Sequence, residues 1–154
     1  MSDQPFPPAE PSAFLSLCAG EWMSLRSSFE LSAGGDDDWH SSERGELVVH
    51  FQTAQDGGLG QLQVIAPGGS ATTLAFGGDG ELVISDGPAG RWRFWAARSM
   101  EMNLVRSDGM AVQERIWFTR ANLRLRSTTA LDWQGKPLQG SFSTDIRRVS
   151  KPAA

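Results

Sequence analysis

The sequence predicts an all-β protein, an antiparallel barrel of about ten strands with one short helix at its N-terminal end. Apolar residues follow a helical period before Gly20 and alternate with polar residues after it. Turn-forming stretches such as "PGG", "GGDG" and "DWQGKP" separate the alternating segments. A sheet of that length, accompanied by a single helix, removes its open edges by closing into a barrel.

The expected helix and strands follow one another along the chain. Ser12 is expected to cap a short helix that Gly20 ends. The apolar face of that helix carries Phe14, Leu17 and Cys18. The expected strands span residues 21–31, 43–53, 59–66, 70–76, 80–85, 91–97, 100–106, 111–118, 122–131 and 141–149. Their short connections favour antiparallel neighbours.

The chain has the size of one globular domain. Its 154 residues can bury a core without disulfides or metals. Proline-rich or polar ends predict flexible tails at 1–11 and 151–154, which leaves 12–150 for the barrel domain. A formal net charge of −4 argues against a nucleic acid or an anionic membrane as partner, because both require a positive field.

Cysteine content and hydropathy predict a cytoplasmic protein. One cysteine excludes an internal disulfide, and no apolar run is long enough for a membrane span or a secretion signal, so a reducing compartment is expected. No metal site is expected, because His40 and His50 lack metal-ligand spacing and the acidic run 36–38 lacks the pattern of a calcium loop. Cys18 has no histidine-bearing partner motif and is expected to be a buried small residue.

Arg124 and Arg126 raise the question of which side chains face the inside of the barrel. They alternate with two leucines, so a strand puts both guanidiniums on one face. The leucines would face inward in an ordinary half-buried strand, whereas the arginines would do so around an anionic ligand. If Trp22 faces the interior, Arg26 in the same strand does too, and an inward guanidinium needs an anionic partner.

Gly20, Glu21 and Trp22 form a G-x-W sequence where the expected helix meets the first strand. This placement resembles the opening signature of the calycin superfamily, the lipocalins and their relatives. In that superfamily the tryptophan closes one end of the barrel, and an arginine from a late strand packs over it. The resemblance implies a lipocalin-like barrel.

Four longer motifs lie near the two ends of the chain. They read "WMSLR" from Trp22, "ERIWF" from Glu114, "NLRLR" from Asn122 and "SFSTDIRR" from Ser141. Together they resemble the S-type phycobiliprotein lyases, the CpcS/CpeS family of bilin lyases, with the pattern W-x-S-x-R, E-R-I/L-W-F, N-L-R-L-R and S-F-x-S-E-I-R-R. Asp145 stands where that pattern has a glutamate, which is one methylene longer. Where many members carry two tryptophans around a glycine turn, this chain reads "LAFGGDGELVIS".

This resemblance implies a lyase that holds a linear tetrapyrrole in the barrel and promotes its thioether attachment to a cysteine of an apo-phycobiliprotein α or β subunit. The phycobilin, phycocyanobilin or phycoerythrobilin, is the substrate, and no further cofactor is implied. The implied setting is phycobilisome assembly in a cyanobacterial cytoplasm. The resemblance leaves open whether the lyase acts as a homodimer or together with a related lyase subunit. The alternative is a non-catalytic carrier or chaperone of a bilin or another small hydrophobic anion.

The resemblance also implies roles for particular residues. Guanidiniums match carboxylates in a bidentate fork, so Arg26, Arg124 and Arg126 are expected to hold the propionates. Asp145 is expected to be the catalytic group, which hydrogen-bonds the pyrrole N–H groups and stabilises the protonated bilin. Glu114 or Glu101 is the alternative for this carboxylate. Arg147 lies on the same strand face as Asp145 and is expected to pair with it, which would keep that carboxylate ionised. The expected aromatic contacts are Trp22, Trp92, Trp95 and Trp117.

Overall fold

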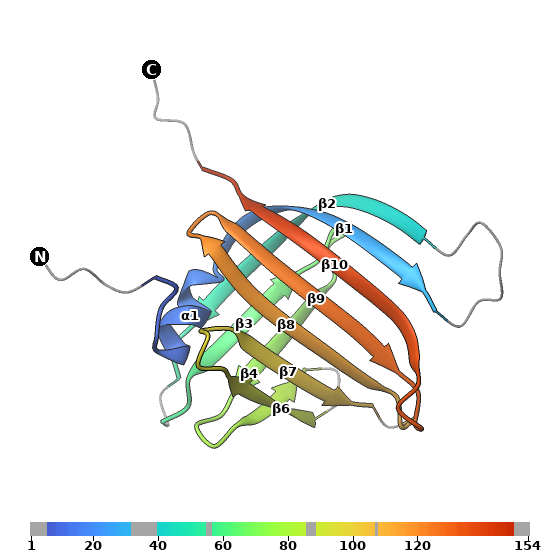
Figure 1. Cartoon of the computed structure of the whole chain (residues 1–154). Coiled ribbons are helices and arrows are strands. Elements are labelled where there is room, and N and C mark those ends of the chain that lie inside the picture. The colour runs from blue at the N-terminus through green and yellow to red at the C-terminus, as the bar shows by residue number, and fades with distance from the viewer. Residues whose placement is uncertain (1–5, 32–39, 55–56, 86–88, 107, 150–154) are drawn as a thin grey trace, which may run out of the picture.

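The chain folds into a closed β-barrel with one helix at its end (Figure 1). The computed structural model describes residues 6–31, 40–54, 57–85, 89–106 and 108–149. The elements are α1 (Pro11–Leu17), β1 (Gly20–Glu30), β2 (His40–Gln52), β3 (Gly60–Ile65), β4 (Ala71–Phe76), β5 (Glu81–Ile84), β6 (Ala89–Phe94), β7 (Met100–Val105), β8 (Ala111–Arg120), β9 (Leu123–Leu131) and β10 (Pro137–Arg147). The barrel order is β1-β10-β9-β8-β7-β6-β5-β4-β3-β2, and antiparallel pairing of β2 with β1 closes it. The predicted ten-stranded barrel with a short N-terminal helix is confirmed.

β2 and β10 begin three and four residues earlier than predicted, and the helix also begins earlier. β2 begins at His40 because its pairing with β1 continues to Phe29. β10 begins at Pro137, where a register shift against β9 accommodates a residue without an N–H donor. The helix begins at Pro11, since the first helical position requires no donor, so the predicted cap Ser12 lies inside the helix.

Helix α1 covers one end of the barrel, as Figure 1 shows. Phe14 and Leu15 are fully buried there, whereas Leu17 is only partly buried. The Phe14 ring meets the Phe94 and Phe118 rings edge-on, with centroids 5.3 and 5.2 Å apart. The helix therefore acts as an apolar plug, and we call this the closed end of the barrel.

The two sides of the barrel interior differ in chemistry. Buried apolar side chains come mainly from β2, β3, β4, β5, β7 and β8, and include Leu47, Val49, Leu62, Phe76, Leu82, Met102 and Ile116. The three adjacent strands β1, β10 and β9 instead present polar side chains to the interior. We call this set the polar wall: Ser24, Arg26, Arg124, Arg126, Ser141, Ser143 and Asp145.

Three predicted features lie outside the described residues: the tail at 151–154, the acidic run 36–38 and residues 1–5 of the N-terminal tail. Within the described part of the chain, no helix is long and apolar enough to cross a membrane. The same part contains no group of three His, Cys, Asp or Glu side chains arranged to hold a metal ion.

Candidate functional site

Trp22 closes the barrel beneath helix α1. Its side chain is fully buried, and its indole N–H donates a hydrogen bond to the carbonyl of Cys18 at 3.0 Å. Two guanidiniums lie over its ring, with the Cζ atoms of Arg147 and Arg124 at 4.1 and 4.8 Å from the centroid. This is the arrangement of tryptophan and late-strand arginine that the G-x-W sequence led us to expect.

Arg147 fastens the closed end to the barrel. Its guanidinium donates hydrogen bonds to the carbonyls of Leu17 and Ala121, at 2.6 and 3.2 Å, and to the carbonyl of Ala19. Gly20 has a φ of +145°, and a Cβ atom at that position would collide with the Arg147 guanidinium. The glycine therefore gives Arg147 the space to lie over the tryptophan.

Asp145 is the centre of a buried charged cluster on the polar wall. The carboxylate is fully buried and accepts hydrogen bonds from Arg124 Nε at 2.9 Å and Arg126 Nε at 2.7 Å. Arg126 Nη2 reaches the second oxygen at 3.2 Å, which makes the Arg126 contact bidentate. Arg126 also contacts Ser24 Oγ at 3.3 Å and Glu114 Oε1 at 3.4 Å.

The cluster keeps its members charged. Burial alone would raise the pKa of Asp145, but the hydrogen bond and charge of Arg126, the charge of Arg124 and the hydrogen bond of Ser24 outweigh it, so the pKa is lowered. Burial alone would likewise lower the pKa of Arg126, but Glu114 and Asp145 raise it above its ordinary value. The site thus contains ionised groups in an apolar barrel.

Strand register explains why these residues meet. Asp145 lies directly across from Arg124 on β9 and from Ser24 on β1. Arg124 and Arg126 of β9 face the interior, where Asp145 and Glu114 are their anionic partners. Leu125, which lies between them, faces outward. The predicted pairing of Asp145 with Arg147 is wrong, because the ion-pair partners of Asp145 are Arg124 and Arg126.

The charged cluster borders an internal cavity of about 240 Å³. Its lining combines apolar side chains with one hydroxyl, that of Thr72, and three charged side chains: Leu47, Val49, Leu62, Val64, Thr72, Leu74, Ile84, Met102, Leu104, Glu114, Ile116, Arg124 and Arg126. An apolar space with a few convergent charged groups is typical of a small-molecule site. It suits a largely apolar molecule that carries N–H donors or carboxylates.

The structure separates the predicted tryptophans from this cavity. Trp92 is partly buried against the core and donates its indole N–H to the carbonyl of Gly77 at 2.8 Å. Trp95 follows β6 and lies under the guanidinium of Arg115, at 4.7 Å. Trp117 alternates with inward-facing neighbours on β8 and therefore faces outward, 5.4 Å from the same guanidinium. None of the four predicted tryptophans is among the residues that line the cavity.

Ser24 belongs to the site but was not predicted there, and Glu114 was predicted only as an alternative to Asp145 for the activating carboxylate. Both fall within quoted motifs, "WMSLR" and "ERIWF". The alternation of side chains along each strand is the sequence pattern that places both residues on the inward face. Ser24 lies between Trp22 and Arg26 on the inward face of β1, and Glu114 precedes the inward Ile116 by two residues.

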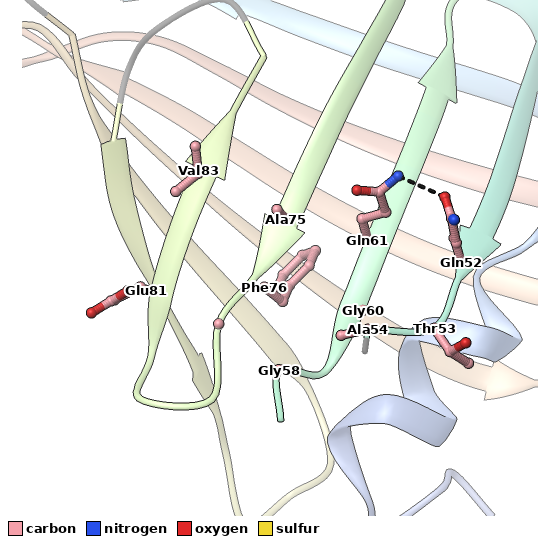
Figure 2. A pocket seen from close by; sticks show the side chains of 11 residues that line it. Gln52, Thr53, Ala54, Gly58, Gly60, Gln61, Ala75, Phe76, Glu81 and Val83 are labelled. Atoms are coloured by element: carbon pink, nitrogen blue, oxygen red, sulfur yellow. Dashed lines mark hydrogen bonds between the residues drawn. The ribbon is translucent and has the colours of Figure 1, made fainter. Parts of the chain in front are cut away.

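A larger hollow of about 530 Å³ lies on the outside of the barrel, over the ends of β3, β4 and β5 (Figure 2). Gln61 in its lining donates a hydrogen bond to Gln52 at 2.9 Å, and Phe76 and Ala75 contribute apolar surface. Glu81 is the one charged residue among the described residues that line it. This hollow lacks the convergent charges of the internal cavity.

The single thiol is expected to be unreactive in the folded protein. Cys18 is fully buried at the closed end, and burial raises the pKa of its thiol more than the nearby charges of Arg124, Arg147 and Arg126 lower it. A chromogenic disulfide reagent should therefore label the native protein at least about a hundredfold more slowly than the protein in denaturant. Equal labelling rates would show that the closed end is open to solvent.

Comparisons with known proteins agree with this fold. The chain is 40% identical over 146 residues to a protein named chromophore lyase CpcS/CpeS 1 from Paulinella chromatophora, with 95% of this chain and 92% of that protein covered. The structure of the S-type phycobiliprotein lyase CPES from Guillardia theta matches with a TM-score of 0.73 and 23% identity, over 90% of this chain and 92% of that chain.

A more distant structural match extends the likeness of fold. A protein of unknown function from Nostoc punctiforme, in the DUF3598 family, matches with a TM-score of 0.56 and 12% identity, over 87% of this chain and 49% of that chain. No protein-family model matches the chain. The two structural matches concern the barrel, whereas the Paulinella relative matches along nearly the whole sequence.

Proposed function

The chain belongs to the CpcS/CpeS family of chromophore lyases, and on that premise we propose that its chromophore is a phycobilin held in the internal cavity. The proposed reaction joins the bilin, phycocyanobilin or phycoerythrobilin, to a cysteine of an apo-phycobiliprotein α or β subunit. The bilin is a substrate, and the proposed reaction uses no other cofactor. The proposed location is the cytoplasm, where the acceptor thiol stays reduced.

The observation that carries this proposal is the charged cluster at the border of an apolar cavity. A linear tetrapyrrole has a conjugated apolar body, pyrrole N–H groups and two propionates. The aliphatic side of the cavity suits the body. Glu114 lines the cavity with its side chain 22% exposed, so its carboxylate is placed to accept hydrogen bonds from pyrrole N–H groups.

For Asp145 we propose a role that differs from the direct pyrrole contact predicted from its motif. Its contacts go to Arg124 and Arg126, and it is not among the residues that line the cavity. Pyrrole binding by Asp145 remains a prediction, but these contacts favour a positioning role, in which Asp145 orients the two arginines. Glu114 then favours the protonated, electron-poor bilin that accepts a thiolate.

The proposed reaction needs no nucleophile from this chain. The sulfur of the acceptor cysteine adds to the ethylidene carbon of ring A, a C–S bond forms, and the thiol proton ends on the bilin. The barrel contributes by holding a flexible tetrapyrrole in one extended conformation and by excluding water from the conjugated system. The buried Cys18 at the closed end is consistent with a nucleophile that comes from the acceptor.

Co-production tests the proposal. This protein, a bilin-producing pathway and an apo-phycobiliprotein subunit are expressed together, and covalent bilin fluorescence is measured on a denaturing gel. We expect fluorescence well above that of cells without this protein. Glu114→Gln should lower the attachment rate by at least about tenfold, because a charge-assisted hydrogen bond is lost.

Glu81→Gln is the matched control, because it removes a carboxylate from the outer hollow instead of the internal cavity. It should leave attachment unchanged. Bilin that binds tightly to the purified protein without any gain in attachment would indicate a carrier. A loss of attachment in Glu81→Gln but not in Glu114→Gln would move the site to the outer hollow.

A further inference from the structure

Helix α1 and Trp22 close one end of the barrel, so a ligand in the internal cavity is reached from the opposite end. We call this the far end, where β1, β3, β5, β7 and β9 finish (Figure 1). The cavity extends toward it, because the cavity lining includes Ile84, the last residue of β5, and Leu104, the last residue but one of β7. Glu114 lies three residues into β8, about 10 Å along that strand from the far end.

Large apolar side chains are exposed together at the far end. Leu31, Val105 and Trp133 are 53%, 58% and 75% exposed, and Leu131 is half-buried. Strand register places Val105 and Leu131 in one row across β8, and the backbone N–H of Leu31 donates a hydrogen bond to β10. We call these four residues the far-end patch. Single exposed apolar residues are ordinary, but a group of them beside a ligand cavity indicates an interaction site.

A rigid turn between β9 and β10 presents Trp133. The Asp132 carboxylate accepts hydrogen bonds from the backbone N–H groups of Gln134 and Lys136, both at 2.9 Å. The turn between β7 and β8 packs against the base of the tryptophan, since a Cβ atom at Gly109 would lie 3.2 Å from Trp133 Cβ. A large indole on a fixed backbone loses little conformational freedom when it binds, and tryptophan is enriched among the residues that dominate protein interfaces.

The charges around the far-end patch are of both signs. Arg106 and Asp108 form an exposed ion pair, with Nη2 and Oδ2 3.9 Å apart, and the exposed Lys136 lies in the turn that carries Trp133. An apolar centre within a mixed polar rim is the usual anatomy of a protein–protein interface. A nucleic acid or an anionic membrane would instead require a positive field. The far-end patch therefore fits a protein partner.

We propose that the far-end patch is the docking surface for the acceptor, the apo-phycobiliprotein subunit, and that Trp133 is its main anchor. This inference rests on the proposed function and extends it, because it names the surface on which the partner binds. The acceptor thiol has to reach a bilin in the cavity, so the acceptor must lie over the far end. A second copy of this chain bound there would block that path.

The test separates acceptor binding from bilin binding. Purified protein is loaded with phycocyanobilin, and the initial rate of covalent attachment is measured against the concentration of apo-subunit. We expect Trp133→Ala to raise the KM for the apo-subunit by about tenfold or more, because an interface anchor is lost. The kcat and the bilin affinity, which an absorbance titration measures, should stay unchanged. Trp133→Phe keeps an aromatic ring and should recover most of the loss.

Val105→Ala and Val149→Ala form a matched pair. Both valines are exposed, but Val105 belongs to the far-end patch, whereas Val149 follows β10 at the closed end. We expect Val105→Ala to raise the KM for the apo-subunit by about threefold, since it removes two methyl groups from the docking surface. Val149→Ala should leave this KM unchanged. If Trp133→Ala does not fold, this pair decides the question.

Several results would overturn the proposal. An unchanged KM in Trp133→Ala is one, and an equal rise in Val105→Ala and Val149→Ala is another. Weaker bilin binding by Trp133→Ala would assign the indole to the bilin site instead. A lower sedimentation mass with an unchanged KM would assign the far-end patch to a contact between copies of this chain. Wild-type protein that binds no bilin, or attaches none, would reject the proposed function itself, and this is measured before any variant.

Discussion

Replacement of Asp145 by asparagine should lower the free energy of unfolding by about 3 to 5 kcal/mol, because it leaves two guanidiniums without their buried counter-ion. Arg124 is 3% exposed and cannot turn to solvent without disrupting the closed end. Denaturant unfolding of the purified variant measures the loss. Asp79→Asn is the matched control in an exposed turn and should change stability by no more than about 0.5 kcal/mol.

The same carboxylate should make the barrel sensitive to acid. The pKa of Asp145 is lowered in the folded state, so its contribution to stability is present above the ordinary carboxyl pKa of about 4 and is lost as the pH falls through the lower folded value. The free energy of unfolding of the wild type should therefore fall steeply as the pH drops below about 4. That of Asp145→Asn should show a smaller fall over the same pH range. Asp145→Glu restores the side chain of the family pattern and should recover most of the stability.

Two results would contradict this account of Asp145. One is an asparagine variant as stable as Asp79→Asn, which would mean that the ion pairs contribute no net stability. The other is a stable asparagine variant that binds bilin normally but does not promote attachment. That outcome would return Asp145 to the direct catalytic role predicted from its motif.

Replacement of Trp22 by alanine should cost a similar amount, about 3 to 5 kcal/mol, because it empties a fully buried site of the largest side chain. The change also removes the ring beneath Arg147 and Arg124 and the hydrogen bond to the carbonyl of Cys18. We expect the thermal transition to fall steeply, measured by circular dichroism. Trp133→Ala is the control, since Trp133 is 75% exposed and its loss should be nearly neutral.

An outcome in which both tryptophan variants lose the same stability would show that the closed end is not tightly packed. Trp22→Phe separates packing from the indole contacts. It keeps most of the buried ring and loses the N–H donor, so its stability should fall between the wild type and Trp22→Ala.

The barrel and the inward direction of its arginines could be predicted from the sequence. Alternation of side chains, with Trp22 as the reference, was sufficient to place Arg26 inside. The partner of Asp145 could not be predicted in this way, because Arg124 and Arg147 share its face and only the register of β9 against β10 decides between them. Register depends on the loop lengths and bulges of the closed barrel.

The direction of the predicted aromatic side chains could not be fixed from the sequence either. Trp117 occupies an outward position between the buried Ile116 and Phe118, and alternation alone does not tell which of two apolar sets faces the interior. Trp95 follows the end of β6, where alternation no longer applies. The apolar side chains that line the cavity are non-aromatic instead, and all of them except Ile116 come from residues 47–104, between the first and second quoted motifs.

The polar wall is assembled from the first strand and the last two, and this has a consequence for how the protein matures. Arg26 and Ser141 are 115 residues apart in the chain, and Ser24 and Arg126 are 102 apart. During synthesis the residues of the apolar wall emerge before β9 and β10, so the ligand site cannot form until these two strands have left the ribosome. High contact order of this kind slows folding. A newly made chain therefore becomes competent for its chromophore only in its final closing step, so a nascent or truncated chain offers a hydrophobic surface but no place for an anion.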